Sequence, residues 1–408
     1  MATGEALLPE LIPVPGVRLG TVCAGIKNAG RKDLVLMELA EGSVCAGVFT
    51  RNAFCAAPVL VAREHIAASN RQPRFLLVNT GNANAGTGER GIADARECCD
   101  AVAAAAGVAA TSVVPFSTGV IGEPLPVDVI GAAVPTALDA LNGSGWDDAA
   151  EGILTTDTRP KGKSHRFHCE GREYVVTGIA KGAGMIRPNM ATMLAYLATD
   201  AAIDATVLQH ILSEAVDMSF NRVTVDGDTS TNDACVLVAT GAAGNSPPRN
   251  SDAPLAVALR DAVQEVCVHL AQALVRDGEG ASKFVTVAVE GGRDQQECLD
   301  VAFTIAHSPL VKTALFASDP NWGRLLAAIG RVGLADLDVN SVAVHINGVL
   351  IAENGCRAAC YTEEQGQAAM APEDIEIRVG LNRGDAAAQV WTTDFSYDYV
   401  RINAEYRT

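Results

Sequence analysis

The order of apolar and polar residues predicts a chain in which helices and strands alternate. Apolar residues recur at helical spacing in several segments, which we expect to be helices. They are Ala93–Ala106, Val127–Leu141, Asp204–Met218, Pro254–Arg276 and Gln295–Ala306. Gly107 is placed to end the first of them, Pro135 weakens the second, and Asp204 is a suitable N-cap for the third.

Short apolar runs rich in β-branched residues predict strands between these helices. They are Tyr174–Ala180, Asn221–Val225, Lys283–Val289, Val342–Ile346, Val349–Ala352, Ile375–Leu381 and Ala388–Thr392. Asn347-Gly348 is a hairpin turn signal, and residues 161–172 and 245–250 are predicted to be polar loops. The run after Thr192 fits either a buried strand or a helix. No repeat of fixed period occurs, so we expect a mixed α/β fold.

Composition and charge narrow the class of protein. The chain has 408 residues, 49% hydrophobic and 19% charged, which is enough for a buried core in one large domain or in two or three. A net charge of -17 argues against nucleic acid or an anionic membrane as a partner. We expect no signal peptide or transmembrane helix. The eleven cysteines, an odd number without a CxxC pair, indicate reduced thiols and a cytoplasmic protein.

The segment Lys181–Leu194 carries the strongest chemical signal. Gly182, Gly184 and a proline precede Ala191-Thr192, and no His, Asp or Glu lies near the threonine to activate its hydroxyl. Cleavage before Thr192 would supply an α-amino group with a pKa of about 7.7–8.0, which suits a general base. The residues alone favour a plainer alternative, a glycine turn that leads into an ordinary buried segment.

A resemblance along the chain favours the first interpretation. KGAGMIRPNMATML resembles the self-cleavage segment of the glutamate N-acetyltransferase family, also called ornithine acetyltransferases, which make N-acetylglutamate in arginine biosynthesis. Further blocks similar to that family follow in collinear order over essentially the whole chain. They are NTGNANAGTG, STGVIGEPLP, TTDTRPK, TVDGDTSTND, VRDGEGASKF, SPLVKTALFASDPNWGRLLAAIG and INAEYRT.

The resemblance implies a layered helix–sheet architecture, of the type that self-cleaving ornithine acetyltransferases share with certain aminopeptidases. It also implies cleavage between Ala191 and Thr192, which gives fragments 1–191 and 192–408. Thr192 would become a new N-terminus, and both fragments would form one intertwined catalytic unit. Two copies of each fragment would assemble into a heterotetramer.

The same resemblance assigns the reaction and its residues. An acetyl group would pass from N2-acetyl-L-ornithine to Thr192 and then to L-glutamate, with ping-pong kinetics. We expect acetyl-CoA to serve as a second donor and no cofactor to be bound. Thr118 and Gly119 match the family's oxyanion-hole positions. The residues that match substrate-binding positions are Thr156, Lys181, Thr192, Glu279, Asn403 and Thr408.

Plainer or different interpretations remain for these residues. Residues 117–119 could form a simple turn, and Lys181 and Glu279 could be solvated surface charges. The chain could also be an N-terminal-nucleophile aminopeptidase, although such enzymes typically use serine, or an uncleaved protein that binds a small molecule.

No metal is expected. The run from Asp226 to Leu237 opens like a calcium loop, but it has threonine where glycine is required and leucine where glutamate is required. His165, His168 and Cys169 have no second ligand pair at suitable spacing.

Overall fold

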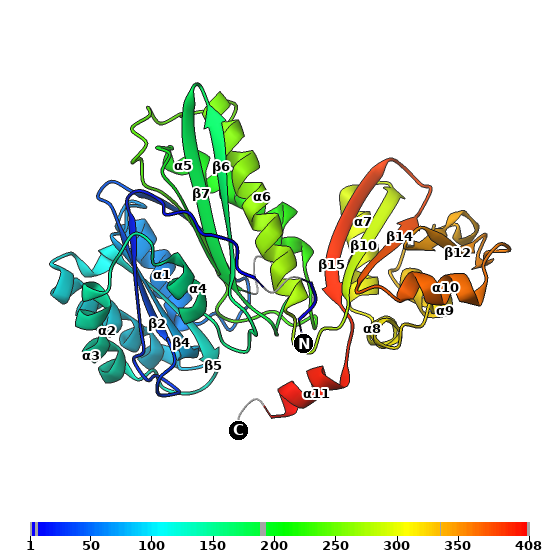
Figure 1. Ribbon diagram of the computed structural model, residues 1–408, viewed down its shortest axis with the longest axis horizontal. Helices are drawn as coiled ribbons and strands as arrows, with labels where there is room; N and C mark the ends of the chain where they lie inside the picture. Colours follow the sequence, from blue (N-terminus) through cyan, green and yellow to red (C-terminus); the bar gives the residue numbers. More distant parts are fainter. Residues whose placement is uncertain (1, 5–6, 188–192, 335, 406–408) are drawn as a thin grey trace. The chain divides into compact units, whose positions relative to one another are not determined.

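The computed structural model describes residues 2–4, 7–187, 193–334 and 336–405. The chain divides into two compact units, which we describe separately (Figure 1). The large unit consists of Leu7–Asn221 and Asp228–Leu274, and the small unit of Met1–Ala6, Arg222–Gly227 and Val275–Thr408. Within the described part of the chain, none of the helices is both long and apolar enough to cross a bilayer.

Two sheets form the middle layers of the large unit. The first has the strand order β1 (Val17–Val22), β2 (Leu34–Leu39), β4 (Phe75–Asn82) and β5 (Val113–Val120). The second has the order β3 (Val44–Phe49), β9 (Ala234–Ala239), β8 (Leu194–Thr199), β7 (Arg172–Lys181) and β6 (Lys161–Cys169). Their apolar faces share one core. Phe116 of β5 meets Tyr196 of β8 edge-on within it, with ring centroids 5.2 Å apart.

Helices cover the outer faces of these sheets. α1 (Ala57–Ala68), α2 (Gly88–Ala106) and α3 (Val127–Asp139) pack on the first sheet. α5 (Ala205–Met218) packs on β3 and β9, and α6 (Pro254–Arg276) brings Val266 against β7. α4 (Trp146–Gly152) lies at an edge, where Trp146 enters the core between the sheets. The large unit is therefore a helix–sheet–sheet–helix stack, as the layered prediction required.

The small unit is built on one mixed sheet. Its strand order is β13 (Cys356–Arg357), β12 (Val349–Glu353), β11 (Ala343–Ile346), β14 (Asp374–Gly380), β10 (Phe284–Gly292) and β15 (Ala386–Thr393). Its helices are α7 (Gln295–Ala306), α8 (Pro309–Phe316), α9 (Trp322–Gly330), α10 (Glu363–Met370) and α11 (Tyr397–Ala404). Short 3-10 turns occur at Ala110–Ser112, Phe220–Arg222 and Val339–Ser341 in the two units.

A buried lysine joins α8 to the end of β15 in the small unit. Lys312 is 1% exposed, and its ammonium donates to Thr392 Oγ1 at 2.9 Å and to the Thr393 carbonyl. Burial lowers the pKa of Lys312 to about 7, although Asp394 and Asp226 oppose the shift. The contact fixes the segment from which the chain continues into α11.

The predictions that rest on the strongest sequence signals are confirmed. α6 and α7 have the predicted bounds, and Gly107 ends α2 with a φ of 70°. The Asp204 carboxylate caps α5 by accepting from Thr206 N at 2.9 Å. Asn347 and Gly348 form the turn between β11 and β12, both with positive φ.

Two local predictions are wrong. Residues 161–172 are mostly strand β6, which pairs with β7 through a turn at Glu170-Gly171. As an edge strand β6 is partly exposed, so its polar residues obscure the strand pattern. The predicted strand 221–225 is largely a 3-10 turn and a single bridge from Val223 to Trp391. The ambiguous run after residue 192 is strand β8.

The second sheet of the large unit draws strands from both sides of residues 191–192. β3, β6 and β7 precede this point, whereas β8 and β9 follow it. β7 and β8 pair antiparallel from Lys181↔Leu194 to Val176↔Thr199. The division into fragments 1–191 and 192–408 does not follow the compact units, and it stays a prediction. A cut there would leave two fragments that share one sheet and one core.

We therefore expect the two fragments to stay together after cleavage. On gel filtration in native buffer they should elute as one species, and a denaturing gel of that peak should show both. In concentrated urea they should elute separately, because noncovalent contacts alone would hold them together. Separate elution in native buffer would contradict this arrangement.

Candidate functional site

Two predicted site residues meet inside the large unit. Lys181 ends β7 and Thr118 lies near the end of β5, and the Lys181 ammonium donates to Thr118 Oγ1 at 3.2 Å. The two residues are 9% and 8% exposed. Lys181 is therefore not a surface charge, and a buried cation stands beside a hydroxyl where β7 and β5 end.

Gly119 follows Thr118 at a point where β4 and β5 approach unusually closely. Its φ is 139°, which L side chains rarely adopt. A Cβ at this position would lie 2.5 Å from Asn82 N and closer still to the Gly81 carbonyl carbon. Only glycine fits this backbone, which suits a peptide N–H that must come close to a ligand.

Polar contacts fix residues 117–119 within the sheet. Ser117 Oγ donates to Asn79 Oδ1 at 2.6 Å, and Asn232 Nδ2 donates to the Ser117 carbonyl at 2.9 Å. Ser117 and Thr118 are buried residues of β5. The alternative that this segment is a simple turn is therefore wrong.

A buried carboxylate that the sequence analysis missed supports Lys181. Asp157 accepts from Lys161 Nζ at 2.7 Å and from Gly182 N at 2.6 Å, and its side chain is fully buried. Burial alone would raise the pKa of Asp157, but the charges of Lys161 and Lys181 and the hydrogen bonds hold it well below its usual range. Asp157 is ionised at neutral pH and fixes the backbone directly after Lys181.

Glu279 and Asn403 meet in the small unit. Glu279 follows the end of α6 and is 8% exposed, and its Oε2 accepts from Asn403 Nδ2 of α11 at 2.8 Å. Glu279 is therefore a buried acid and not a solvated helix-end charge. Thr156 directly precedes Asp157 in the large unit and is partly exposed.

The remaining predicted site residues, Ala191, Thr192 and Thr408, lie outside the described residues. The structure places Met193 and Leu194, and Leu194 pairs with Lys181 across β7 and β8. Residue 192 is thus two positions along the chain from the strand partner of Lys181.

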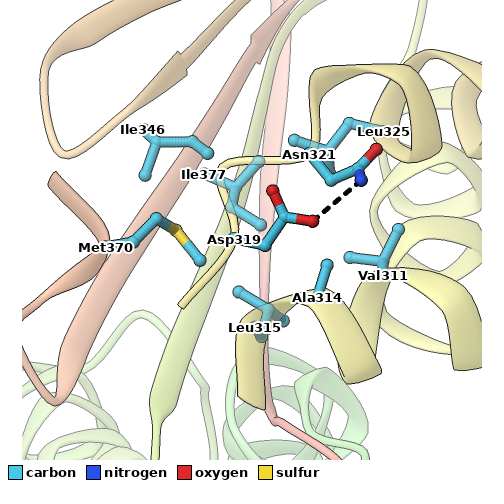
Figure 2. Close-up of a pocket in the computed structure, with 9 residues that line it drawn as sticks. All are labelled: Val311, Ala314, Leu315, Asp319, Asn321, Leu325, Ile346, Met370 and Ile377. Carbon is cyan, nitrogen blue, oxygen red and sulfur yellow. Dashed lines mark hydrogen bonds between the residues drawn. The ribbon is translucent and has the colours of Figure 1, made fainter. Parts of the chain in front are cut away.

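A pocket in the small unit, unlike the site around Lys181, is lined mainly by apolar side chains (Figure 2). Its empty volume is about 210 Å³, part of it open to solvent, and apolar side chains of α8, α9 and the sheet form most of its wall. Its polar members are Asp319 and Asn321, which bond to each other at 2.9 Å. It offers no cation for a carboxylate, so we do not assign the substrate to it.

Each histidine of β6 that could bind a metal lies instead beside one glutamate. His165 lies 3.0 Å from Glu265, and His168 lies 3.5 Å from Glu173. Within residues 2–4, 7–187, 193–334 and 336–405, no group of three or more His, Cys, Asp or Glu is arranged to hold a metal ion.

Comparison with known proteins decides the family. The model of the ArgJ family matches residues 18–408. The chain belongs to the ArgJ family. It is 59% identical over 408 residues to the arginine biosynthesis bifunctional protein ArgJ of Pseudomonas syringae pv. tomato, with both chains fully covered. The ArgJ protein of Methylococcus capsulatus is 58% identical over 406 residues, which cover 98% of this chain and 97% of that protein.

Among solved structures, the arginine biosynthesis bifunctional protein argJ of Bacillus halodurans is 39% identical, with a TM-score of 0.48. The match covers 50% of this chain and 95% of that one. Membership of the ArgJ family makes this protein an acyltransferase of arginine biosynthesis. The resemblance seen in the sequence is confirmed, and the aminopeptidase alternative is not supported.

Gly119→Ala tests the close approach of β4 and β5. The added Cβ would collide with the backbone of residues 81 and 82, so we expect acyl transfer to slow on the order of a hundredfold. The matched control is Gly122→Ala. Gly122 also has a positive φ, 87°, but nothing lies within 4 Å of the added atom. Rates should be measured on purified, folded variants, and equal losses in both would contradict the prediction.

Lys161→Met tests the buried ion pair. It leaves Asp157 without its closest cation, so we expect the free energy of unfolding in urea to fall by about 3 kcal/mol at pH 7. Lys163→Met, on the same strand, is the control, because Lys163 is 31% exposed and lies 3.9 Å from Glu265. It should change stability by less than about 1 kcal/mol.

The same pair predicts a dependence on pH. The pKa of Asp157 is lowered in the folded state, so its stabilisation is complete above the ordinary aspartate pKa of about 3.9 and is lost as the pH falls below it. Urea titrations from pH 6 to pH 3 should therefore show a larger loss in the wild type than in Lys161→Met. Parallel curves would contradict the assignment.

Proposed function

We propose that this acyltransferase moves the acetyl group of N2-acetyl-L-ornithine to L-glutamate and so gives L-ornithine and N-acetyl-L-glutamate. The observation that carries the proposal is the buried Lys181–Thr118 contact beside Gly119, at the strand end that pairs with the start of β8. Lys181 offers a cation for a substrate carboxylate, and Thr118 and Gly119 offer polar groups for an oxyanion. Membership of the ArgJ family supports the choice of reaction.

Thr192 is the nucleophile in this proposal. Its hydroxyl first attacks the Ala191 carbonyl, and hydrolysis of the resulting ester releases fragments 1–191 and 192–408. The new α-amino group of Thr192 then takes the proton of its own hydroxyl as that oxygen attacks the acetyl carbonyl. Ornithine leaves, and the amine of glutamate takes the acetyl group from Thr192. Two separate half-reactions result.

Thr118 and Gly119 stabilise the oxyanion that forms in each half-reaction. Preorganised donors of this kind contribute because they need no rearrangement as the charge develops. The tight β4–β5 contact and the bonds at Ser117 support this role, since they restrict movement of the segment. Thr156 and Lys181 bind substrate in the same unit, where Asp157 fixes the chain next to Lys181.

Glu279 binds the ammonium group of the substrate in this proposal. Its buried carboxylate suits a cationic ligand, and the amide of Asn403 orients it. Thr408 is proposed to line the site. We further propose that acetyl-CoA serves as a second acetyl donor and that two copies of each fragment assemble into a heterotetramer.

Thr192→Ala is the decisive variant. On a denaturing gel it should give one band near 42 kDa, the mass of the whole chain, where the wild type gives two. It should form no acetylglutamate from acetylornithine, because both the hydroxyl and the new amine are lost. Thr192→Ser, which keeps the hydroxyl, is the control and should still cleave.

Two further measurements separate the parts of the proposal. Wild-type enzyme incubated with acetylornithine alone should gain one acetyl group on fragment 192–408 by mass spectrometry. Acetylglutamate formation with acetyl-CoA as sole donor tests the second activity. An uncleaved enzyme with full transfer activity would overturn the role of Thr192, and hydrolysis of amino-acid amides without transfer would overturn the reaction.

A further inference from the structure

An asparagine just before β9 connects two strands of the first sheet. Asn232 is 6% exposed, and its Nδ2 donates to the Ala83 carbonyl at 2.5 Å and to the Ser117 carbonyl at 2.9 Å. Its Oδ1 accepts from Thr231 Oγ1 at 2.7 Å. Ala83 directly follows β4, and Ser117 belongs to β5. The two N–H donors of one buried amide therefore link β4 to β5 from a segment that belongs to neither strand.

This link lies beside the close approach of Gly119 to β4. The register of the parallel β4–β5 pair shifts at Gly81 and Asn82, the residues whose backbone a Cβ on Gly119 would strike. Such an irregularity disrupts the regular ladder of hydrogen bonds between strands. Asn232 bonds to the residue that follows the shift on β4 and to the residue two positions before Gly119 on β5. It therefore connects the strands where the ladder itself is irregular.

The segment that carries Asn232 is itself held in place. Thr50, which directly follows β3, is 1% exposed. Its hydroxyl donates to the Ser230 carbonyl at 2.8 Å, and its N–H donates to the Asp233 carbonyl at 2.9 Å. The backbone is thus anchored both before and after Asn232. A side-chain amide on such a backbone can fix the residues to which it bonds.

We propose that Asn232 is a positioning residue for acyl transfer, because its amide holds the backbone on which Thr118 and Gly119 stabilise the oxyanion. The inference rests on the proposed function and adds a residue that acts through that pair. The bond from Asn232 to the carbonyl of residue 117 fixes the peptide group directly before Thr118. Oxyanion donors act because they are already in place, so a looser segment would stabilise the transition state less and bind the ground state equally well.

A purely structural role for Asn232 predicts a different result. An amide that only stabilised the large unit would affect the amount of folded enzyme and not the transition state selectively. L-ornithine separates the two roles, because it has no acetyl carbonyl and its binding needs no oxyanion donor. If Asn232 positions the donors, its loss should slow turnover of folded enzyme while L-ornithine still binds.

The test compares Asn232→Leu with Asn245→Leu. Asn245 follows β9 at its other end, and its Nδ2 also donates to two carbonyls, those of Ala202 at 2.9 Å and Ser246 at 3.0 Å. Asn232→Leu removes both donors, so kcat for acetylglutamate formation should fall by about 10- to 100-fold. The Kd of L-ornithine, measured by calorimetry, should change by less than about threefold. Asn245→Leu should keep both kcat and this Kd within about threefold of the wild type.

A double-mutant cycle tests whether Asn232 acts through the oxyanion donors. Thr118→Val removes the hydroxyl donor and keeps the shape of the side chain. In that background Asn232→Leu should lower kcat by only about threefold, because one of the groups that Asn232 positions is already lost. The remaining loss is the part that acts through Gly119. If Asn232→Leu lowers kcat by the same factor in both backgrounds, the proposal is overturned.

Asn232→Asp keeps the test decisive if leucine at this position prevents folding. Aspartate has the same shape as asparagine, but it offers at most one donor, and only while it is protonated. Its kcat should therefore lie about 3- to 30-fold below that of the wild type, with the Kd of L-ornithine again unchanged. A wild-type kcat in Asn232→Asp would contradict the proposal.

All rates are expressed per folded enzyme, with the folded fraction taken from urea unfolding of each variant. The proposal also fails if Asn245→Leu loses as much kcat as Asn232→Leu, or if L-ornithine binding weakens as strongly as kcat falls. Failure of the proposed function gives a different result. In that event the wild type itself would form no acetylglutamate from acetylornithine, and this is measured in the same assay before any variant is compared.

Discussion

The buried carboxylate of Asp157 determines how the candidate site is held. It bonds to Lys161 on β6 and to the backbone at Gly182, directly after the last residue of β7. Two charged side chains taken out of water are tolerated only when their partners are well placed. Asp157 also acts on the buried Lys181, because the charges of Lys161 and Lys181 both lower the pKa of Asp157. The position of Lys181 beside Thr118 depends on this arrangement.

Two acids of this part of the large unit have pKa values shifted in opposite directions. The charges of Lys161 and Lys181 hold the pKa of Asp157 well below its usual range, whereas burial raises the pKa of Asp233, directly before β9, well above it. Residues of one chemical type thus differ in role because of their surroundings. Two lysines, Lys161 and Lys181, thus act on Asp157 within a protein of net charge -17. These lysines would attract a small carboxylate substrate.

The sequence predicted the elements whose signals are local. The long amphipathic helix 254–276 and the Asn347-Gly348 turn depend on neighbours a few residues apart, so their patterns are readable. The sequence analysis missed strand β6 because its pairing with β7, and not its own residue pattern, makes it a strand. Among site residues, Thr118 and Lys181 came from family resemblance. Asp157 was missed because its bond to the backbone at Gly182 spans 25 positions, and its pairing with Lys161, four residues away, is not a pattern that marks a site.

The strand order of the second sheet has a further consequence for how the protein folds. β7 and β8 are sequence neighbours in the uncut chain, so their pairing is an intramolecular event. Once the connection between them is cut, reassembly requires two separate molecules to meet, and recovery from denaturation becomes dependent on concentration. Dilute enzyme that unfolds would then be lost, and its lifetime would be set by its unfolding rate. Cleavage of one peptide bond would thus make the persistence of the folded enzyme depend on its unfolding rate and not on reversible folding.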